Sequence, residues 1–207
     1  MLNRAARGMS LIELMIGLAI LAVLLALALP EYNTFIRNTK VKNLALSLEA
    51  GLQLARTEAI RRNENVRFQI VTDLTSGCTV AGTEVSTPHW VVSRDDPTGR
   101  CDAEPSDSVP PMIVQKWDFK ESDAGSGLAW NLALAGTSNA LVTFNGLGRV
   151  TPPPAGAITI EVRPVETSGI ACAPAGSVRC LRVTVSPGGQ IRTCDPAMTV
   201  ATDPRYC

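Results

Sequence analysis

Six cysteines are the residues of this sequence most able to form covalent links. None of them forms a Cys-x-x-Cys pair, and the chain has a single histidine, so the usual ligand sets for zinc are absent. An even number of cysteines suits three disulfides in an oxidising compartment, and six cysteines allow fifteen pairings. We therefore expect no metal site and a non-cytoplasmic location for the part of the chain that holds Cys78, Cys101, Cys172, Cys180, Cys194 and Cys207.

The sequence contains no complete motif for catalysis or for binding a cofactor. His89 is the only histidine, and no nucleophile-elbow sequence accompanies it, so we interpret it as a strand-edge residue. The stretch Gly146-Leu147-Gly148 lacks the third glycine and the following helix of a dinucleotide-binding loop. Asp95, Asp96 and Asp102 do not have the spacing of a calcium-binding EF-hand. The sequence thus predicts neither an enzyme nor a cofactor.

One acidic residue, Glu13, lies at the start of a long apolar run. The sixteen residues from Leu14 to Leu29 carry no charge and span about 24 Å as a helix, and adding Met9 to Glu13 extends this to about 31 Å. That length matches the hydrocarbon layer of a bilayer, where a charge costs on the order of 2.5 to 3.5 kcal/mol at mid-depth and less near an interface. A membrane helix of this kind needs a reason to keep Glu13.

Two common kinds of N-terminal segment could explain this apolar run, a secretory signal peptide and a plain membrane anchor. A secretory signal peptide would use Arg4 and Arg7 as its basic region and Ala26-Leu27-Ala28 as its cleavage site, but its apolar core is usually shorter and lacks an acidic residue. A plain membrane anchor would let Glu13 reach the head groups.

The helical pattern continues beyond the apolar run. Pro30 removes a backbone donor and clashes with the preceding turn, so we expect a kink there. An apolar stripe then recurs every three or four residues from Val41 to Ala59, which is typical of a helix that packs on a sheet. We expect this helix to end at residues 63–65.

Beyond the helix, short β-like runs alternate with turn residues, which predicts an antiparallel, β-rich head. The predicted strands are Val66 to Thr72, Trp90 to Ser93, Met112 to Phe119, Ala140 to Phe144, Ile158 to Arg163, Val178 to Ser186 and Gln190 to Thr193.

The residues from Arg7 to Met15 (RGMSLIELM) resemble the class III prepilin motif, a short basic leader that ends in glycine before an apolar helix. The resemblance implies cleavage after Gly8 by a prepilin peptidase and N-methylation of the new first residue, Met9. Glu13 then becomes the fifth residue of the mature chain. Because cleavage creates an ammonium group on Met9, the Glu13 carboxylate of one subunit and the ammonium of a neighbour would neutralise each other in the membrane.

The helix end LARTEAIRR (residues 54–62) and the late segment with a Gly-Gly turn (residues 179–194) are similar to the GspH/FimT group of pseudopilins and minor pilins. This resemblance implies an α+β, type IV pilin-like fold, in which a long N-terminal helix with a transmembrane first half packs on a β-rich head. We expect a leader peptide at 1–8, a transmembrane and filament-core helix at 9–29, its amphipathic continuation at 30–63, and a periplasmic or extracellular head at 64–207.

The implied function is structural. The resemblance suggests a low-abundance subunit at or near the tip of a type II secretion pseudopilus or a type IV pilus, and the sequence leaves these two machines open. Implied partners are other pilins or pseudopilins in a helical filament, the prepilin peptidase, the inner-membrane assembly platform and the bacterial inner membrane, which the chain crosses once.

For the cysteines, we favour the sequential pairing, since a disulfide that holds the C-terminal segment is common in pilins. The pairs are Cys78 with Cys101, Cys172 with Cys180, and Cys194 with Cys207.

A DNA-binding role is the alternative, because some FimT-like minor pilins capture DNA during natural transformation. The chain has 19 basic and 19 acidic residues, which argues against a dedicated nucleic-acid protein. A phosphate-binding patch requires that several arginines converge, and Gln190 stands where the related DNA-binding motif has arginine. The candidate contacts are Arg179, Arg182, Arg192 and Arg205.

Overall fold

The computed structural model describes residues 10–86, 88–119, 130–164 and 171–207. The chain divides into two compact units, Met1–Arg37 and Asn38–Cys207. A single helix, α1 (Leu11–Arg62), contributes to both units, so its last 25 residues belong to the second one. Among the described residues, no helix combines the length and apolar character required of a membrane span.

Both ends of α1 are capped. At the start, Ser10 accepts hydrogen bonds from the backbone N–H of Glu13 through its side chain (3.4 Å) and its carbonyl (3.1 Å). At the end, Asn63 adopts a left-handed conformation (φ 55°), and Glu64 N–H donates to the Ala59 carbonyl (3.2 Å). This is a Schellman motif with asparagine in place of glycine. The predicted helix end at residues 63–65 is therefore confirmed.

Within the second unit, the stripe from Val41 to Ala59 is buried against the sheets, as predicted from its spacing. The rings of Phe68 and Trp90, on the four-stranded sheet, lie close to the helix backbone at Gly51. A Cβ added to Gly51 would lie 2.7 Å from Phe68 and 3.1 Å from Trp90. Trp90 also donates from Nε1 to the Ser47 hydroxyl (3.0 Å). Glycine in mid-helix therefore allows the close approach of the sheet.

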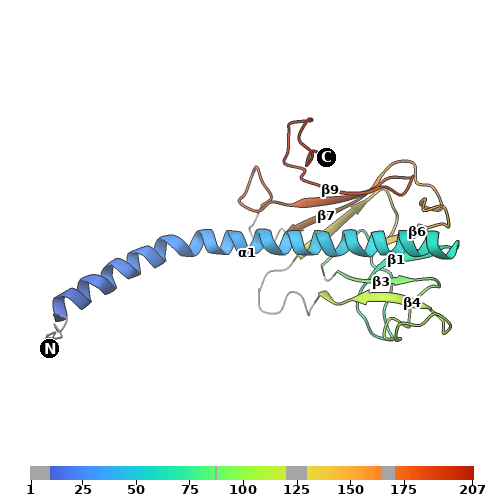
Figure 1. Cartoon of the computed structure of the whole chain (residues 1–207), viewed down its shortest axis with the longest axis horizontal. Coiled ribbons are helices and arrows are strands. Elements are labelled where there is room, and N and C mark those ends of the chain that lie inside the picture. The colour runs from blue at the N-terminus through green and yellow to red at the C-terminus, as the bar shows by residue number, and fades with distance from the viewer. Residues whose placement is uncertain (1–9, 87, 120–129, 165–170) are drawn as a thin grey trace, which may run out of the picture. The chain divides into compact units, whose positions relative to one another are not determined.

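The head contains two sheets, and every pair of strands within them is antiparallel. Figure 1 shows the second half of α1 running between strands of the two sheets. The four-stranded sheet has the order β4 (Ile113–Trp117), β3 (His89–Ser93), β1 (Val66–Val71), β6 (Leu141–Phe144). The five-stranded sheet has the order β2 (Glu84–Val85), β5 (Trp130–Ala135), β7 (Ile158–Pro164), β8 (Leu181–Val185), β9 (Ile191–Cys194).

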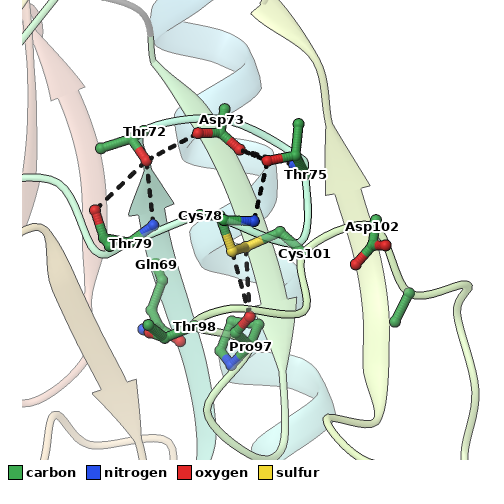
Figure 2. The surroundings of a disulfide bond; sticks show 12 residues. Gln69, Thr72, Asp73, Thr75, Cys78, Thr79, Pro97, Thr98, Cys101 and Asp102 are labelled. Atoms are coloured by element: carbon green, nitrogen blue, oxygen red, sulfur yellow. Dashed lines mark hydrogen bonds between the residues drawn. A yellow bond between two sulfur atoms is a disulfide. The ribbon is translucent and has the colours of Figure 1, made fainter.

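A second, smaller core lies on the other face of the four-stranded sheet. Val71 and Val91 pack there against Ile113 and the Cys78–Cys101 disulfide, and both cysteines are fully buried. Figure 2 shows how hydroxyl and carboxylate groups of the covering loop bond to one another around this disulfide; for example, the Thr75 hydroxyl donates to Asp73 Oδ1 (2.5 Å). The disulfide thus fills the centre of a loop-covered core.

The antiparallel head and the α+β class are confirmed, but some strand predictions differ from the structure. The predicted strand from Val178 to Ser186 is shorter, because β8 begins at Leu181 after the Cys172–Cys180 disulfide. Two strands, β2 and β5, were not predicted at all. In the β5 sequence WNLALA, Trp130 is the one residue of a type enriched in strands, so its β-propensity is low and pairing with β7 determines its conformation.

Candidate functional site

The N-terminal candidate site begins outside the described residues, which do not include the proposed cleavage position between Gly8 and Met9. Glu13 is described and lies in the first turn of α1, in the third helical position after the Ser10 cap. A carboxylate at this end of a helix interacts favourably with the helix dipole. Glu13 is exposed, and among the described residues its carboxylate makes no hydrogen bond or ion pair. It is therefore available to a partner group.

An exposed apolar surface surrounds the helix after Glu13. The large apolar side chains between Leu11 and Leu25 are each more than half exposed, from 51% at Leu21 to 79% at Leu11. They lie on all sides of the helix because the sequence is apolar at nearly every position. An apolar surface of this extent marks a site for lipid or for other protein segments.

Helix α1 continues without interruption through Pro30. The expected kink at this residue stays a prediction.

Polar contacts attach the second half of α1 to distant parts of the head. The Thr193 hydroxyl donates to Glu49 Oε2 (2.7 Å), and Arg56 Nε donates to the Gly148 carbonyl (3.2 Å). Near the start of the second unit, Arg179 N–H donates to Asn38 Oδ1 (2.8 Å). These bonds join β9, the turn after β6 and the segment before β8 to one helix.

Three disulfides are present, and the structure contains no free cysteine. The pairs are the same as the sequential pairs favoured from the sequence, namely Cys78–Cys101, Cys172–Cys180 and Cys194–Cys207. The last pair closes the C-terminal segment onto the end of β9.

The four candidate DNA-binding arginines are mostly engaged locally. Arg182 pairs with Glu161 across β7 and β8 (2.8 Å), and Arg192 donates to the Tyr206 carbonyl. Arg205 pairs with Asp203 at 2.8 Å. Arg179 is exposed, and its backbone N–H is the group that bonds to Asn38. Carboxylates of this chain thus neutralise two of the four guanidinium groups, those of Arg182 and Arg205, which reduces the charge left for phosphate binding.

The Asp203–Arg205 pair lies within the loop closed by the Cys194–Cys207 disulfide. Hydrogen bonds from the side chain and then the backbone of Arg205 lower the pKa of Asp203 to about 2. The Asp203 carboxylate is therefore ionised throughout the physiological range.

The weaker catalytic and metal candidates occupy structural positions. His89 is buried as the first residue of β3, with Nδ1 3.0 Å from Asp118 Oδ1. Burial opposes ionisation of Asp96, but bonds from Thr98 and Gln69 and the charge of Arg67 outweigh it and lower the pKa of Asp96. In the part of the chain that is described, no group of three His, Cys, Asp or Glu residues is arranged to hold a metal ion.

Comparison with known families resolves the identity of the fold. The family model described as type II transport protein GspH matches residues 44–189, which is 146 of the 207 residues. The chain belongs to the GspH family. The match covers the last 19 residues of α1 and the strands from β1 to β8. The family resemblance inferred from residues 54–62 and 179–194 is thereby confirmed.

A second match concerns the N-terminus of this GspH-family chain. The prokaryotic N-terminal methylation motif matches residues 3–29, a segment that contains Gly8, Met9 and Glu13. Among curated proteins, the pilin-like protein PilA1 of Thermus thermophilus is 42% identical over 71 residues, which are 34% of this chain and 44% of that protein. The chain thus matches less than half the length of this relative.

The search of solved structures found two pilin-type proteins among its matches. The type IV minor pilin FimU of Pseudomonas aeruginosa gives a TM-score of 0.45 at 15% identity, covering 77% of this chain and 99% of that chain. The minor pseudopilin EpsH of Vibrio cholerae gives 0.41 at 18% identity, with coverage of 77% and 99%.

Some residues with structural roles were missed by sequence reasoning. The pattern Ser10-x-x-Glu13 is a capping-box signature and was available from the sequence. The Glu49–Thr193 bond joins residues 144 positions apart, so no local pattern signals it.

Proposed function

We propose that this GspH-family chain is a structural subunit, a minor pilin or pseudopilin, of a filament rooted in the bacterial inner membrane. It acts at or near the tip of a type II secretion pseudopilus or a type IV pilus. Before assembly, the segment 9–29 crosses the membrane once and anchors the chain there, and the head lies on the periplasmic side. After assembly, the same segment lies in the core of the filament.

The observation that carries this proposal is the exposed apolar surface from Leu11 to Leu25, interrupted at its start by the Glu13 carboxylate. Lipid covers such a surface before assembly, and neighbouring helices cover it afterwards. Transfer from lipid into a helix bundle keeps the surface away from water, so extraction from the membrane has a low free-energy cost compared with transfer into water. The match to the N-terminal methylation motif supports the same interpretation.

Glu13 supplies the polar contact of assembly. Prepilin peptidase cuts after Gly8 and methylates the nitrogen of Met9, which leaves a positive charge at the new N-terminus. In the filament this charge lies against the Glu13 carboxylate of a neighbouring subunit, so two charges that are costly in an apolar medium neutralise each other. The assembly platform then moves the paired subunits out of the membrane.

The test separates this charge pair from a simple helix-capping role. Glu13→Gln removes the charge but keeps a side chain that suits a capping box, and Ser10→Ala removes the cap but keeps the charge. We expect Glu13→Gln and Glu13→Ala to lower the amount of the chain in sheared filaments roughly tenfold or more, the loss expected when one partner of a desolvated charge pair is removed. We expect Ser10→Ala to assemble nearly as well as the wild type.

Head folding is checked in the same samples by formation of the three disulfides. Wild-type incorporation of Glu13→Gln would overturn the charge-pair role. Loss of assembly in Ser10→Ala to the same extent as in Glu13→Gln would indicate that the helix start itself is the requirement.

A further inference from the structure

A rigid turn after β6 presents an apolar side chain to solvent. Leu147 is 76% exposed, more than any other large apolar residue of the second unit among those described. Asn145 Oδ1 accepts hydrogen bonds from the backbone N–H groups of Leu147 (3.0 Å) and Arg149 (3.1 Å). Gly148 N–H donates to the Asn145 carbonyl (2.8 Å). Leu147 is therefore exposed by a well-bonded backbone and not by a loosely held loop.

The turn is also fixed on the end of α1. A Cβ on Gly146 would lie 2.4 Å from Asn63 Oδ1, so the turn and the helix cap are in direct contact. At Gly148, a Cβ would lie 2.7 Å from Ile60 Cδ1, and Ile60 is itself 49% exposed. The exposed Ile60 side chain thus lies against the glycine that follows Leu147 in the turn.

A cleft of about 480 Å³ opens beside this turn. Its apolar walls include Val150, Pro153 and Pro187, and Arg149 is the one charged residue among the described residues that line it. Within the described part of the chain, the Arg149 guanidinium takes part in no hydrogen bond or ion pair. The cleft therefore combines apolar walls with an exposed guanidinium that pairs with no carboxylate of the described residues.

The neighbouring charges leave this surface basic. At the end of α1, Glu58 already pairs with Arg61 (2.6 Å) and Arg62 (2.7 Å), and Glu64, just after the helix, pairs with Arg94 (2.7 Å). Hydrogen bonds from Arg61 and Arg62 outweigh the effect of burial and lower the pKa of Glu58. A complementary ligand must bring its own carboxylate to Arg149, together with an apolar side chain for Leu147 and Ile60.

We propose that this surface, formed by Ile60, Leu147, Arg149 and the adjacent cleft, binds an acidic loop on the head of another pilin-family subunit. The proposal rests on the filament role given above. Arg149 and Arg56, whose Nε donates to the Gly148 carbonyl (3.2 Å), are too few cations for a nucleic acid, and with their apolar neighbours they suit a protein loop better. Two apolar anchors are few for an independent complex, but a neighbour held in the same filament has a high effective concentration and needs few contacts.

The experiment uses the full chain in cells that carry the complete assembly machinery. Leu147 is replaced by the photo-reactive amino acid p-benzoylphenylalanine, and a matched position is Val200, 58% exposed in the loop after β9. We expect illumination to link position 147, and not position 200, to a processed pilin-family subunit. Mass spectrometry should locate the link beside an Asp or Glu of that subunit.

Charge reversal tests the role of Arg149. We expect Arg149→Glu to lower the yield of the adduct roughly tenfold or more, and exchange of the linked acidic residue for arginine to restore it. An adduct that Arg149→Glu leaves unchanged would overturn the proposal, and so would adducts only with DNA or with a secreted protein.

The same samples separate this proposal from the filament role. A chain that is cut after Gly8 and enters filaments without any adduct at position 147 would overturn the docking surface alone. A chain that keeps its first eight residues and is absent from filaments would overturn both proposals.

Discussion

Thr193 on β9 donates a hydrogen bond of 2.7 Å from its hydroxyl to Glu49 Oε2 on α1. The other carboxylate oxygen of Glu49 accepts from Gln53 Nε2 at 3.0 Å. The last strand of the five-stranded sheet is thus attached to the helix whose apolar stripe packs against both sheets. Helix α1 therefore binds the head through a polar contact as well as through its apolar stripe.

Removal of this contact should loosen the attachment of β9. We expect Thr193→Val to lower the free energy of unfolding of the unit 38–207 by about 1 kcal/mol, the usual net value of a hydrogen bond. That unit contains both hydrophobic cores and is suitable for urea unfolding. Thr159→Val on β7 is a matched control, because its hydroxyl bonds to no other described residue. Equal effects of the two substitutions would contradict this role.

Gly51 should not tolerate a side chain. Alanine usually stabilises a helix relative to glycine by roughly 0.8 to 1 kcal/mol, but here its Cβ would lie 2.7 Å from the ring of Phe68. Overpacking of a core costs about 1 to 3 kcal/mol, so we expect Gly51→Ala to destabilise the head in thermal or urea unfolding. Gly156→Ala, at a site with open space around it, should change stability little. A stabilised Gly51→Ala protein would show that the aromatic contact is looser than described.

The three disulfides should differ in their access to reductant. Cys78 and Cys101 are fully buried, whereas Cys207 is exposed. Because exchange requires attack on a sulfur atom, we expect a mild thiol to open Cys194–Cys207 first and Cys78–Cys101 last. Alkylation followed by peptide mass analysis measures the order. Simultaneous reduction of all three pairs in the folded protein would contradict it.

The C-terminal loop should keep its ion pair in moderate acid. Arg205 lowers the pKa of Asp203 to about 2, below the ordinary 3.8. The contribution of this pair to stability is therefore complete above pH 3.8 and is lost as the pH falls through about 2. A ¹³C NMR titration of the Asp203 carboxyl should give a midpoint near 2, and Arg205→Gln should raise it. A midpoint of 3.8 in the wild type would contradict the pairing.

The helix and the class of the head could be predicted from sequence because their signals are local. The apolar stripe from Val41 to Ala59 repeats at helical spacing, and Ile158 to Arg163 alternates between apolar and polar residues. The strand β5 could not be predicted, since its alanines and leucines favour no strand and its partner β7 lies more than twenty residues away.

Of the two candidate sites, the sequence indicates one and not the other. Glu13 stands out because a charge in an apolar run is rare, so the sequence alone directs attention to it. Leu147 carries no such signal, because an isolated leucine between two glycines is exposed only through the hydrogen bonds that Asn145 forms with the turn. The surface around Leu147 can be recognised only in the folded chain, where the turn after β6 lies next to the end of α1 and residues 187–188.

The N-terminal peptide of the native protein tests the filament role most directly. The chain is isolated from the cell envelope and its first peptide is identified by mass spectrometry. The proposed processing predicts a chain that begins with N-methylated Met9 and keeps Glu13 as its fifth residue. A chain that retains residues 1–8, or one that begins at Leu29 after cleavage as a signal peptide, would contradict it.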